Sequence, residues 1–250
     1  MQLLVSVANA GEASTALDGG ADVIDAKDPT AGALGAVSVP VLREIRAAVG
    51  DARPVTAALG DAEDETAVEA DARAFAAAGA AFVKVGFAGV TDAARATALG
   101  AAAVRGAATG GAGVILVAYA DAERVGSLAP AALVAVAAAA GARGVLLDTA
   151  DKSGPGLLGW YALDALAVWT REAHAAGLLV ALAGKLAADD VAAVRGVWPD
   201  VVGVRGAACD GGRVGRVSAE RVRVLCALVA GAPANASGRA SARSEVLVER

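Results

Sequence analysis

Four lysines stand at or near the carboxyl ends of predicted β-strands, and the 250-residue chain contains no others. They are Lys27, Lys84, Lys152 and Lys185. A buried lysine can lose its proton and attack a carbonyl carbon to form a Schiff base, whereas arginine stays protonated. A genome that favours arginine and alanine codons explains why lysines are few. It does not explain their shared position, which predicts lysine chemistry at strand ends.

Two aspartates accompany these lysines. Asp25 lies two residues before Lys27, so both side chains face the same side of a strand. Asp148 ends another predicted strand, and Lys152 follows it in the next loop. Clustered cations in a partly dry pocket disfavour protonation of one amine, and the neighbouring carboxylates and amines can then move protons. The alternative for each pair is a structural ion pair at the rim.

Glycines and basic residues follow the last two predicted strands. We expect these two loops to bind a phosphate through backbone N–H groups, with charge from the lysine and the arginine. The predicted phosphate-binding residues are Gly184, Lys185, Arg205, Gly206 and Ala207.

Strands and helices alternate along the whole chain. We predict strands at residues 3–7, 22–25, 54–59, 82–86, 114–119, 144–148, 178–183 and 201–205. Helical stretches with polar N-caps and glycine ends separate them, at residues 12–17, 39–48, 65–78, 91–105, 130–140, 163–176, 187–195 and 218–229. Ser38, Thr91 and Ser218 are the expected caps, and the acidic run 61–65 is interpreted as a solvated helix start.

Eight strands alternating with eight helices predict an α/β fold, a (β/α)8 TIM barrel, in a single domain over residues 1–230. In such a barrel the strand ends share one mouth, where the lysines and aspartates would meet. An open doubly wound sheet is the rival, but no G-x-G-x-x-G turn follows the first strand. Residues 231–250 lack periodicity, and we expect a disordered tail.

Composition excludes several classes of protein. Mean hydropathy is +0.55, yet the longest apolar run, residues 131–140, is too short to span a membrane. A net charge of −5 without a basic cluster argues against a nucleic-acid partner. Two cysteines and the absence of a signal-peptide pattern favour the cytoplasm. The single histidine, His174, is expected on a helix surface, so we predict neither a metal site nor a cofactor.

Six segments resemble the (5-formylfuran-3-yl)methyl phosphate synthase family, also called 4-(hydroxymethyl)-2-furancarboxaldehyde-phosphate synthase, of methanofuran biosynthesis. In this sequence they read GADVIDAKDP at 20–29, ALGD at 58–61, VKVG at 83–86, YADAERV at 119–125, LDTA at 147–150 and VGVRGAAC at 202–209. The resemblance runs from about residue 2 to residue 229. It implies a barrel enzyme that condenses two molecules of glyceraldehyde 3-phosphate into a furan aldehyde that keeps one phosphate.

The resemblance also implies residue roles. Lys27 matches the Schiff-base lysine and Lys84 the proton acceptor, while Asp25, Asp148 and Lys152 match residues that line the site. Lys185 departs from the pattern, because a small hydroxyl residue is expected there. Two alternatives stay open: a lysine-dependent, class I aldolase for another phosphorylated aldehyde, and an inactive barrel that only binds sugar phosphates. Self-association is also left open.

Overall fold

The chain folds into a closed barrel of eight parallel strands in sequence order, in a computed structural model that describes residues 1–231. Each strand pairs with the next, and β8 pairs with β1 to close the ring. The predicted (β/α)8 barrel is thereby confirmed. The strands are β1 Gln2–Val7, β2 Val23–Ala26, β3 Val55–Asp61, β4 Phe82–Gly86, β5 Gly113–Tyr119, β6 Gly144–Asp148, β7 Leu179–Leu182 and β8 Val201–Val204.

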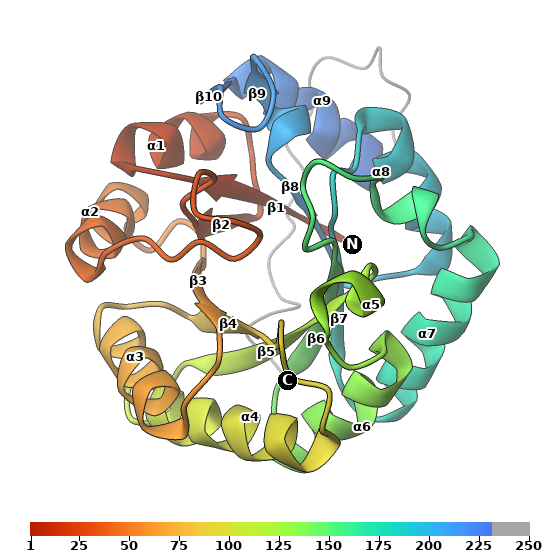
Figure 1. The fold of residues 1–250 in the computed structure, drawn as a ribbon. Coiled ribbons are helices and arrows are strands. Elements are labelled where there is room, and N and C mark those ends of the chain that lie inside the picture. Colours follow the sequence, from red (N-terminus) through yellow and green to blue (C-terminus); the bar gives the residue numbers. More distant parts are fainter. Residues whose placement is uncertain (232–250) are drawn as a thin grey trace.

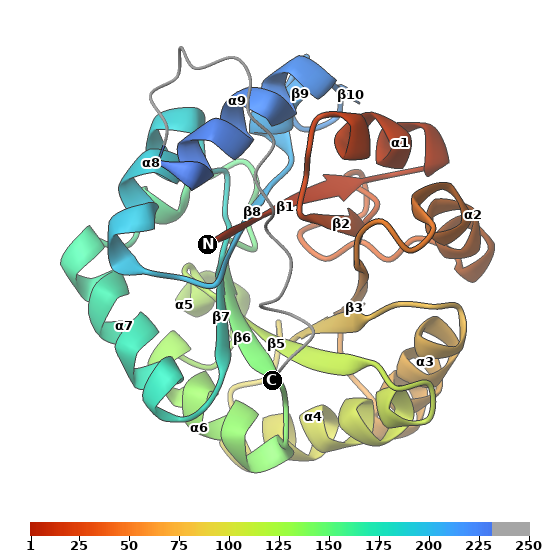
Figure 2. The ribbon, with the colours of Figure 1, turned by 180° about the vertical axis from the view of Figure 1, so that it is seen from behind.

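Apart from the short α5, the α-helices form an outer ring around the strands, as the view of Figure 1 and the reverse view of Figure 2 both show. Outward-facing strand residues such as Val5, Ile24 and Val83 are buried in the layer between the strands and this ring. The helices are α1 Ala10–Asp18, α2 Val39–Val49, α3 Glu65–Ala77, α4 Ala93–Ala108, α5 Ala122–Val125, α6 Pro130–Ala140, α7 Leu163–Ala175, α8 Ala188–Val194 and α9 Ala219–Ala230. None of the helices within residues 1–231 combines the length and apolar character needed to cross a membrane.

Polar side chains begin several of these helices. Asn9, Asp64 and Asp92 each accept a hydrogen bond from the backbone N–H three residues on, which satisfies a donor that the helix leaves unpaired. Ser38 caps α2, as predicted. The prediction of Thr91 as the cap of α4 is wrong by one residue, because the carboxylate of Asp92 reaches the N–H group of Arg95.

Short elements in the loops were not predicted from the sequence. They are α5, three 3-10 turns at Leu157–Gly159, Arg195–Val197 and Gly206–Ala208, and a small antiparallel pair of β9 Cys209–Asp210 with β10 Arg216–Val217. Most lie in loops that follow the carboxyl ends of strands. The predicted disordered tail begins at Gly231, which ends α9, and its residues 232–250 lie outside the described part of the chain.

The interior of the barrel is only partly filled by side chains. β7 and β8 each carry a small residue at an inward position, Ala181 and Gly203, and another small residue, Ala183, follows β7. Barrels of this fold are usually packed with bulky branched residues, so these positions leave space. On the opposite side, Leu34 from the β2–α2 loop is buried against Ala58, Tyr119 and other interior residues. The open space therefore lies beside β7 and β8.

Candidate active site

A cavity of about 360 Å³ opens at the carboxyl ends of the strands. Its walls combine apolar interior residues with charged side chains from the strand ends and the following loops. All the site residues predicted from the sequence line it: Asp25, Lys27, Lys84, Asp148, Lys152, Gly184, Lys185, Arg205, Gly206 and Ala207. The fold thus brings residues that are up to 182 positions apart in the sequence to one cavity (207 − 25 = 182).

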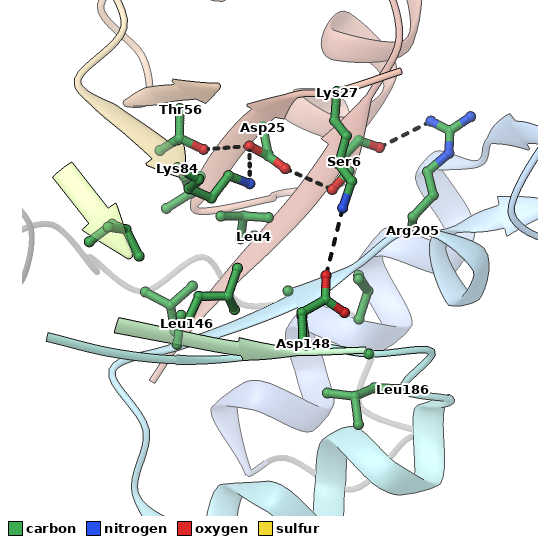
Figure 3. Close-up of a pocket in the computed structure, with 18 of the residues that line it drawn as sticks. Leu4, Ser6, Asp25, Lys27, Thr56, Lys84, Leu146, Asp148, Leu186 and Arg205 are labelled. Atoms are coloured by element: carbon green, nitrogen blue, oxygen red, sulfur yellow. Dashed lines mark hydrogen bonds and ion pairs between the residues drawn. The ribbon is translucent and has the colours of Figure 1, made fainter. Parts of the chain in front are cut away.

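The Asp25 carboxylate is held by three side chains inside the barrel, as Figure 3 shows. One oxygen accepts the Ser6 hydroxyl at 2.8 Å. The other accepts the Thr56 hydroxyl at 2.8 Å and lies 2.5 Å from Lys84 Nζ. All four residues are buried. The charges of Asp25 and Lys84 are tolerated in this interior because each lies against the other and the two hydroxyls donate hydrogen bonds to the carboxylate.

Lys84 lies in the middle of β4, not at its end as the sequence suggested. It is opposite Ala58 of β3, and the small alanine leaves the long lysine side chain a path to Asp25 of β2. The lysine side chain has four methylene groups, so its ammonium group can act well away from its own Cα.

Asp148, at the end of β6, lies between two lysines. Its Oδ1 accepts a hydrogen bond from Lys152 Nζ at 2.6 Å. Its Oδ2 is 3.8 Å from Lys27 Nζ, as Figure 3 shows. Burial acts to raise the pKa of Asp148, but the charges of Lys152 and Lys27 and two hydrogen bonds hold it below its usual range. Asp148 is therefore an ionised carboxylate at neutral pH.

Lys27 differs from the other three lysines in its contacts. Lys84, Lys152 and Lys185 each donate a short bond to a carboxylate or a carbonyl. Lys27 Nζ, at 3.8 Å from Asp148, is beyond hydrogen-bonding distance, and within residues 1–231 no other side chain bonds to it. Its amine is therefore the one left available to a molecule in the cavity.

Burial lowers the pKa of Lys27 from its ordinary value of 10.5 to about 8. Asp148 opposes this shift, while the positive charges of Lys84 and Lys152 add to it. At pH 7 a pKa of about 8 leaves roughly one amine in ten neutral, against about one in three thousand for an ordinary lysine. The site thus supplies a nucleophilic amine near neutral pH.

The Lys152 loop is fixed by a buried aspartate that the sequence did not single out. Asp121 follows β5, and its two oxygens accept the backbone N–H groups of Ala150 and Asp151 at 2.7 and 2.8 Å. Lys152 also donates to the Thr149 carbonyl at 2.5 Å. These bonds place the Lys152 ammonium group on Asp148.

Asp121→Ala should lower both the stability of the fold and any catalytic activity of this cavity. It leaves two partly buried N–H donors without their carboxylate partner, which costs about 1–3 kcal/mol in the free energy of unfolding. Because Lys152 is then less well placed, we expect kcat to fall by about 10- to 100-fold. Urea unfolding and steady-state rates measure the two effects. Asp71→Ala, at an exposed position of α3, is the matched control; an equal loss in both variants would contradict this role.

The loop after β7 contains two residues in left-handed backbone conformations. Gly184 has φ of 107°, which favours glycine, and Lys185 has φ of 54°. The Lys185 ammonium group reaches across to the carbonyl of Gly154 in the loop after β6. Lys185 lines the cavity and has no carboxylate within 4.0 Å in residues 1–231. Its predicted contact with a phosphate stays a prediction.

The guanidinium group of Arg205, just beyond β8, is fully hydrogen-bonded to other groups of the protein. Its guanidinium group pairs with both oxygens of Glu12 and donates to the carbonyls of Ser6, Arg213 and Gly215. These bonds use all five of its N–H groups. Its predicted phosphate contact stays a prediction, and any such contact would require one of these bonds to break.

A tyrosine at the mouth also escaped the sequence analysis. Tyr119 ends β5 beside Asp148, and its buried hydroxyl donates to Asp61 at 2.7 Å. Burial raises the pKa of Tyr119, and the charge of Asp61 raises it further. Gly86 makes room for this contact, because a Cβ there would collide with both side chains. Asp61 therefore ends β3 and holds Tyr119, and the predicted acidic helix start applies only from Asp64 onwards.

Ser6 and Thr56, which hold Asp25, were also missed by the sequence analysis, although the sequence contains a signal for them. Each is a hydroxyl residue inside a predicted apolar strand, at a position whose neighbours two residues away face the interior. His174, expected on the surface, is 38% exposed in its side chain and bonds to Asp200 at 2.9 Å. Among residues 1–231 no group of three His, Cys, Asp or Glu residues is arranged to hold a metal ion.

Comparison with known proteins identifies the family. A family model described as 4-HFC-P synthase matches residues 3–226. The chain belongs to this family. It is 38% identical over 234 residues to the (5-formylfuran-3-yl)methyl phosphate synthase of Methanocaldococcus jannaschii, covering 90% of this chain and 98% of that protein. Its identity to the enzyme of that name from Methanopyrus kandleri is 39% over 234 residues, covering 92% and 99%. The resemblance seen in the sequence is confirmed, and the protein is an enzyme of the 4-HFC-P synthase kind.

Solved structures support the fold of this 4-HFC-P synthase family member. The orotidine 5'-phosphate decarboxylase of Pyrococcus horikoshii superposes with a TM-score of 0.64 at 15% identity, covering 92% of this chain and 99% of that one. At this level of identity the similarity concerns the barrel alone.

Proposed function

We propose that this enzyme condenses two molecules of glyceraldehyde 3-phosphate into (5-formylfuran-3-yl)methyl phosphate through a Schiff base on Lys27. One observation carries the proposal most directly: Lys27 is buried at the cavity, has a pKa of about 8 and is the lysine without a hydrogen bond in the described chain. Its family relatives are named for this product. The product would feed furan biosynthesis, including that of methanofuran.

The first steps follow from imine chemistry. The neutral Lys27 amine adds to the aldehyde carbon, and loss of water gives an iminium ion. Removal of the proton at C2 then gives an enamine, whose nitrogen lone pair expels phosphate from C3. The remaining three-carbon imine forms a carbon–carbon bond with the second triose phosphate. Ring closure, dehydration and hydrolysis of the imine release the product, with a net loss of one phosphate and two waters, as the formulae require.

The charged groups around Lys27 can carry out the proton transfers that these steps require. Asp148 is ionised and lies between Lys27 and Lys152, so it can pass a proton between the two amines. Lys84 lies 2.5 Å from Asp25 in the opposite wall and is the proposed acceptor of the substrate proton. For this role its ammonium group first passes a proton to the Asp25 carboxylate, and the neutral amine then accepts the proton from C2. The Ser6 and Thr56 hydroxyls keep Asp25 in place during these transfers.

Incubation of the purified enzyme with glyceraldehyde 3-phosphate tests the proposal. We expect an ultraviolet-absorbing furan aldehyde with the mass of the monophosphate, and one inorganic phosphate released per two substrates. A different aldol product would instead indicate a class I aldolase. Binding without any product would indicate a barrel that only binds sugar phosphates. Either outcome would reject the synthase proposal.

The rate should depend on pH through Lys27. Because the neutral amine is the nucleophile, kcat/KM should rise about tenfold per pH unit below pH 8 and level off above it. Lys152→Met removes a charge that lowers the pKa of Lys27, so the midpoint should move above pH 8. Arg216→Met, at an exposed position outside the cavity, should leave the midpoint unchanged. A pH-independent rate between pH 6 and pH 9 would contradict this role for Lys27.

A further inference from the structure

Six basic side chains line the cavity, and they divide into two groups. Four have a carboxylate within 4.0 Å: Lys27 and Lys152 near Asp148, Lys84 on Asp25 and Arg205 on Glu12. Lys185 and Arg213 have no such partner in residues 1–231. Lys185 was already expected to bind an anion, but no role has yet been assigned to Arg213.

Arg213 lies in the loop between β9 and β10 and faces the β2–α2 loop. Its Nε donates to the carbonyl of Pro29 at 3.2 Å, and its Nη2 donates to the carbonyl of Gly32 at 2.6 Å. These two bonds use two of its five N–H groups, so three stay available for a ligand. Arg213 is partly buried, so fewer waters screen the attraction between its charge and a bound anion. The same burial lowers its pKa.

Arg205 anchors this loop. Its Nε donates to the backbone carbonyl of Arg213 at 3.0 Å, and its Nη2 donates to that of Gly215 at 2.8 Å. The guanidinium group of Arg205 is itself fixed by Glu12 at the start of α1. Arg205 therefore positions the backbone that carries Arg213. Arg205 has a structural role, whereas the charge of Arg213 is available to a ligand.

We propose that Arg213 binds a phosphate group of the substrate at the mouth of the barrel. The proposal rests on the proposed function, which brings two phosphates into the cavity. A guanidinium group with three N–H groups available matches the oxygens of a phosphate, and such bonds between charged groups are roughly twice as strong as neutral ones. Because the same guanidinium group donates to the carbonyls of Pro29 and Gly32, the bound phosphate would also lie near the β2–α2 loop.

Titration of the full chain with inorganic phosphate, followed by calorimetry, tests the proposal without any catalysis. Arg213→Gln removes the charge but keeps an amide that can donate to the loop carbonyls. It should weaken phosphate binding by at least about tenfold. Arg216→Gln, on β10 at an exposed position outside the cavity, is the matched control and should bind as the wild type does.

Arg213→Lys keeps the charge and loses the planar fork, so we expect phosphate binding between that of the wild type and Arg213→Gln. This variant carries the test if Arg213→Gln unfolds in a thermal melt. Unchanged phosphate affinity in the folded Arg213 variants, equal losses in Arg213→Gln and Arg216→Gln, or a wild type that binds no phosphate would each overturn the proposal.

Steady-state kinetics separate a binding role from a structural one. Arg213→Gln should raise the KM for glyceraldehyde 3-phosphate by at least about tenfold and leave the borohydride-trapped adduct with unphosphorylated glyceraldehyde at its wild-type yield. An equal loss of both would overturn the proposal. If phosphate binding depends on Arg213 but the wild type makes no furan, the proposed function is rejected and the Arg213 proposal is retained. Furan synthesis with an unchanged KM in Arg213→Gln would reject the Arg213 proposal alone.

Discussion

Lys27→Arg should lower kcat/KM by at least about 10⁴-fold, because removal of a covalent nucleophile costs on the order of 10⁴–10⁶ in rate. Arginine keeps the positive charge beside Asp148 but stays protonated and cannot form an imine. The variant therefore preserves the electrostatic environment of the cavity and removes only the neutral amine. Lys27→Met, which also removes the charge, should be equally inactive.

Borohydride trapping with glyceraldehyde 3-phosphate locates the imine directly. The chain has four lysines, so peptide mass mapping can assign the reduced adduct to one of them. We expect the adduct on Lys27 in the wild type and none in Lys27→Arg. Arg216→Met is the control for handling and folding, and should carry the adduct on Lys27. An adduct on Lys84, or an active Lys27→Arg enzyme, would contradict an imine on Lys27.

Lys84→Met should be the most destabilising single change at the site, by about 3–5 kcal/mol in the free energy of unfolding. It removes the cation 2.5 Å from Asp25 and leaves a carboxylate with no exposed surface inside the barrel. The Ser6 and Thr56 hydroxyls remain, but two neutral donors do not replace a charge. Urea unfolding at pH 7 measures the loss.

A second substitution shows whether the stability lost in Lys84→Met comes from an unpaired buried charge or from a lost packing contact. Asp25→Asn combined with Lys84→Met removes both charges, so the double variant should recover most of the stability lost by Lys84→Met alone. The surface pair of Arg46 and Asp51 provides the comparison, because Arg46→Met leaves only a fully solvated carboxylate and should hardly change the unfolding free energy. Additive losses in the double variant would contradict the buried ion pair.

These two predictions describe opposite environments for two lysines of the same cavity. Lys84 is matched at short distance by Asp25 and contributes to the fold. Lys27 is buried without an adequate partner, which makes its charged form unfavourable and its neutral form available. The same barrel therefore holds a closely ion-paired lysine and a nucleophilic amine, and the difference lies in the distance from each lysine to its nearest carboxylate.

Local sequence patterns were sufficient for the fold. Short runs rich in valine and leucine, separated by alanine-rich segments with polar starts and glycine ends, set the order of strands and helices. Strand alternation placed Asp25 with Lys27 on one face, and the strand ends placed Asp148 near the mouth. The motif resemblance and the barrel could both be predicted because each depends on residues that are neighbours in the chain.

The sequence by itself identified ten of the residues that line the cavity, and the tertiary structure decided what each one does there. Nothing local indicates that Lys84 pairs with Asp25, that Glu12 takes up the guanidinium group of Arg205, or that Arg213 meets the β2–α2 loop. Burial and distance set the charge state of a side chain, and both arise only when strands and loops far apart in sequence close into one barrel. The four lysines share a sequence signature, and their surroundings give each a separate chemistry.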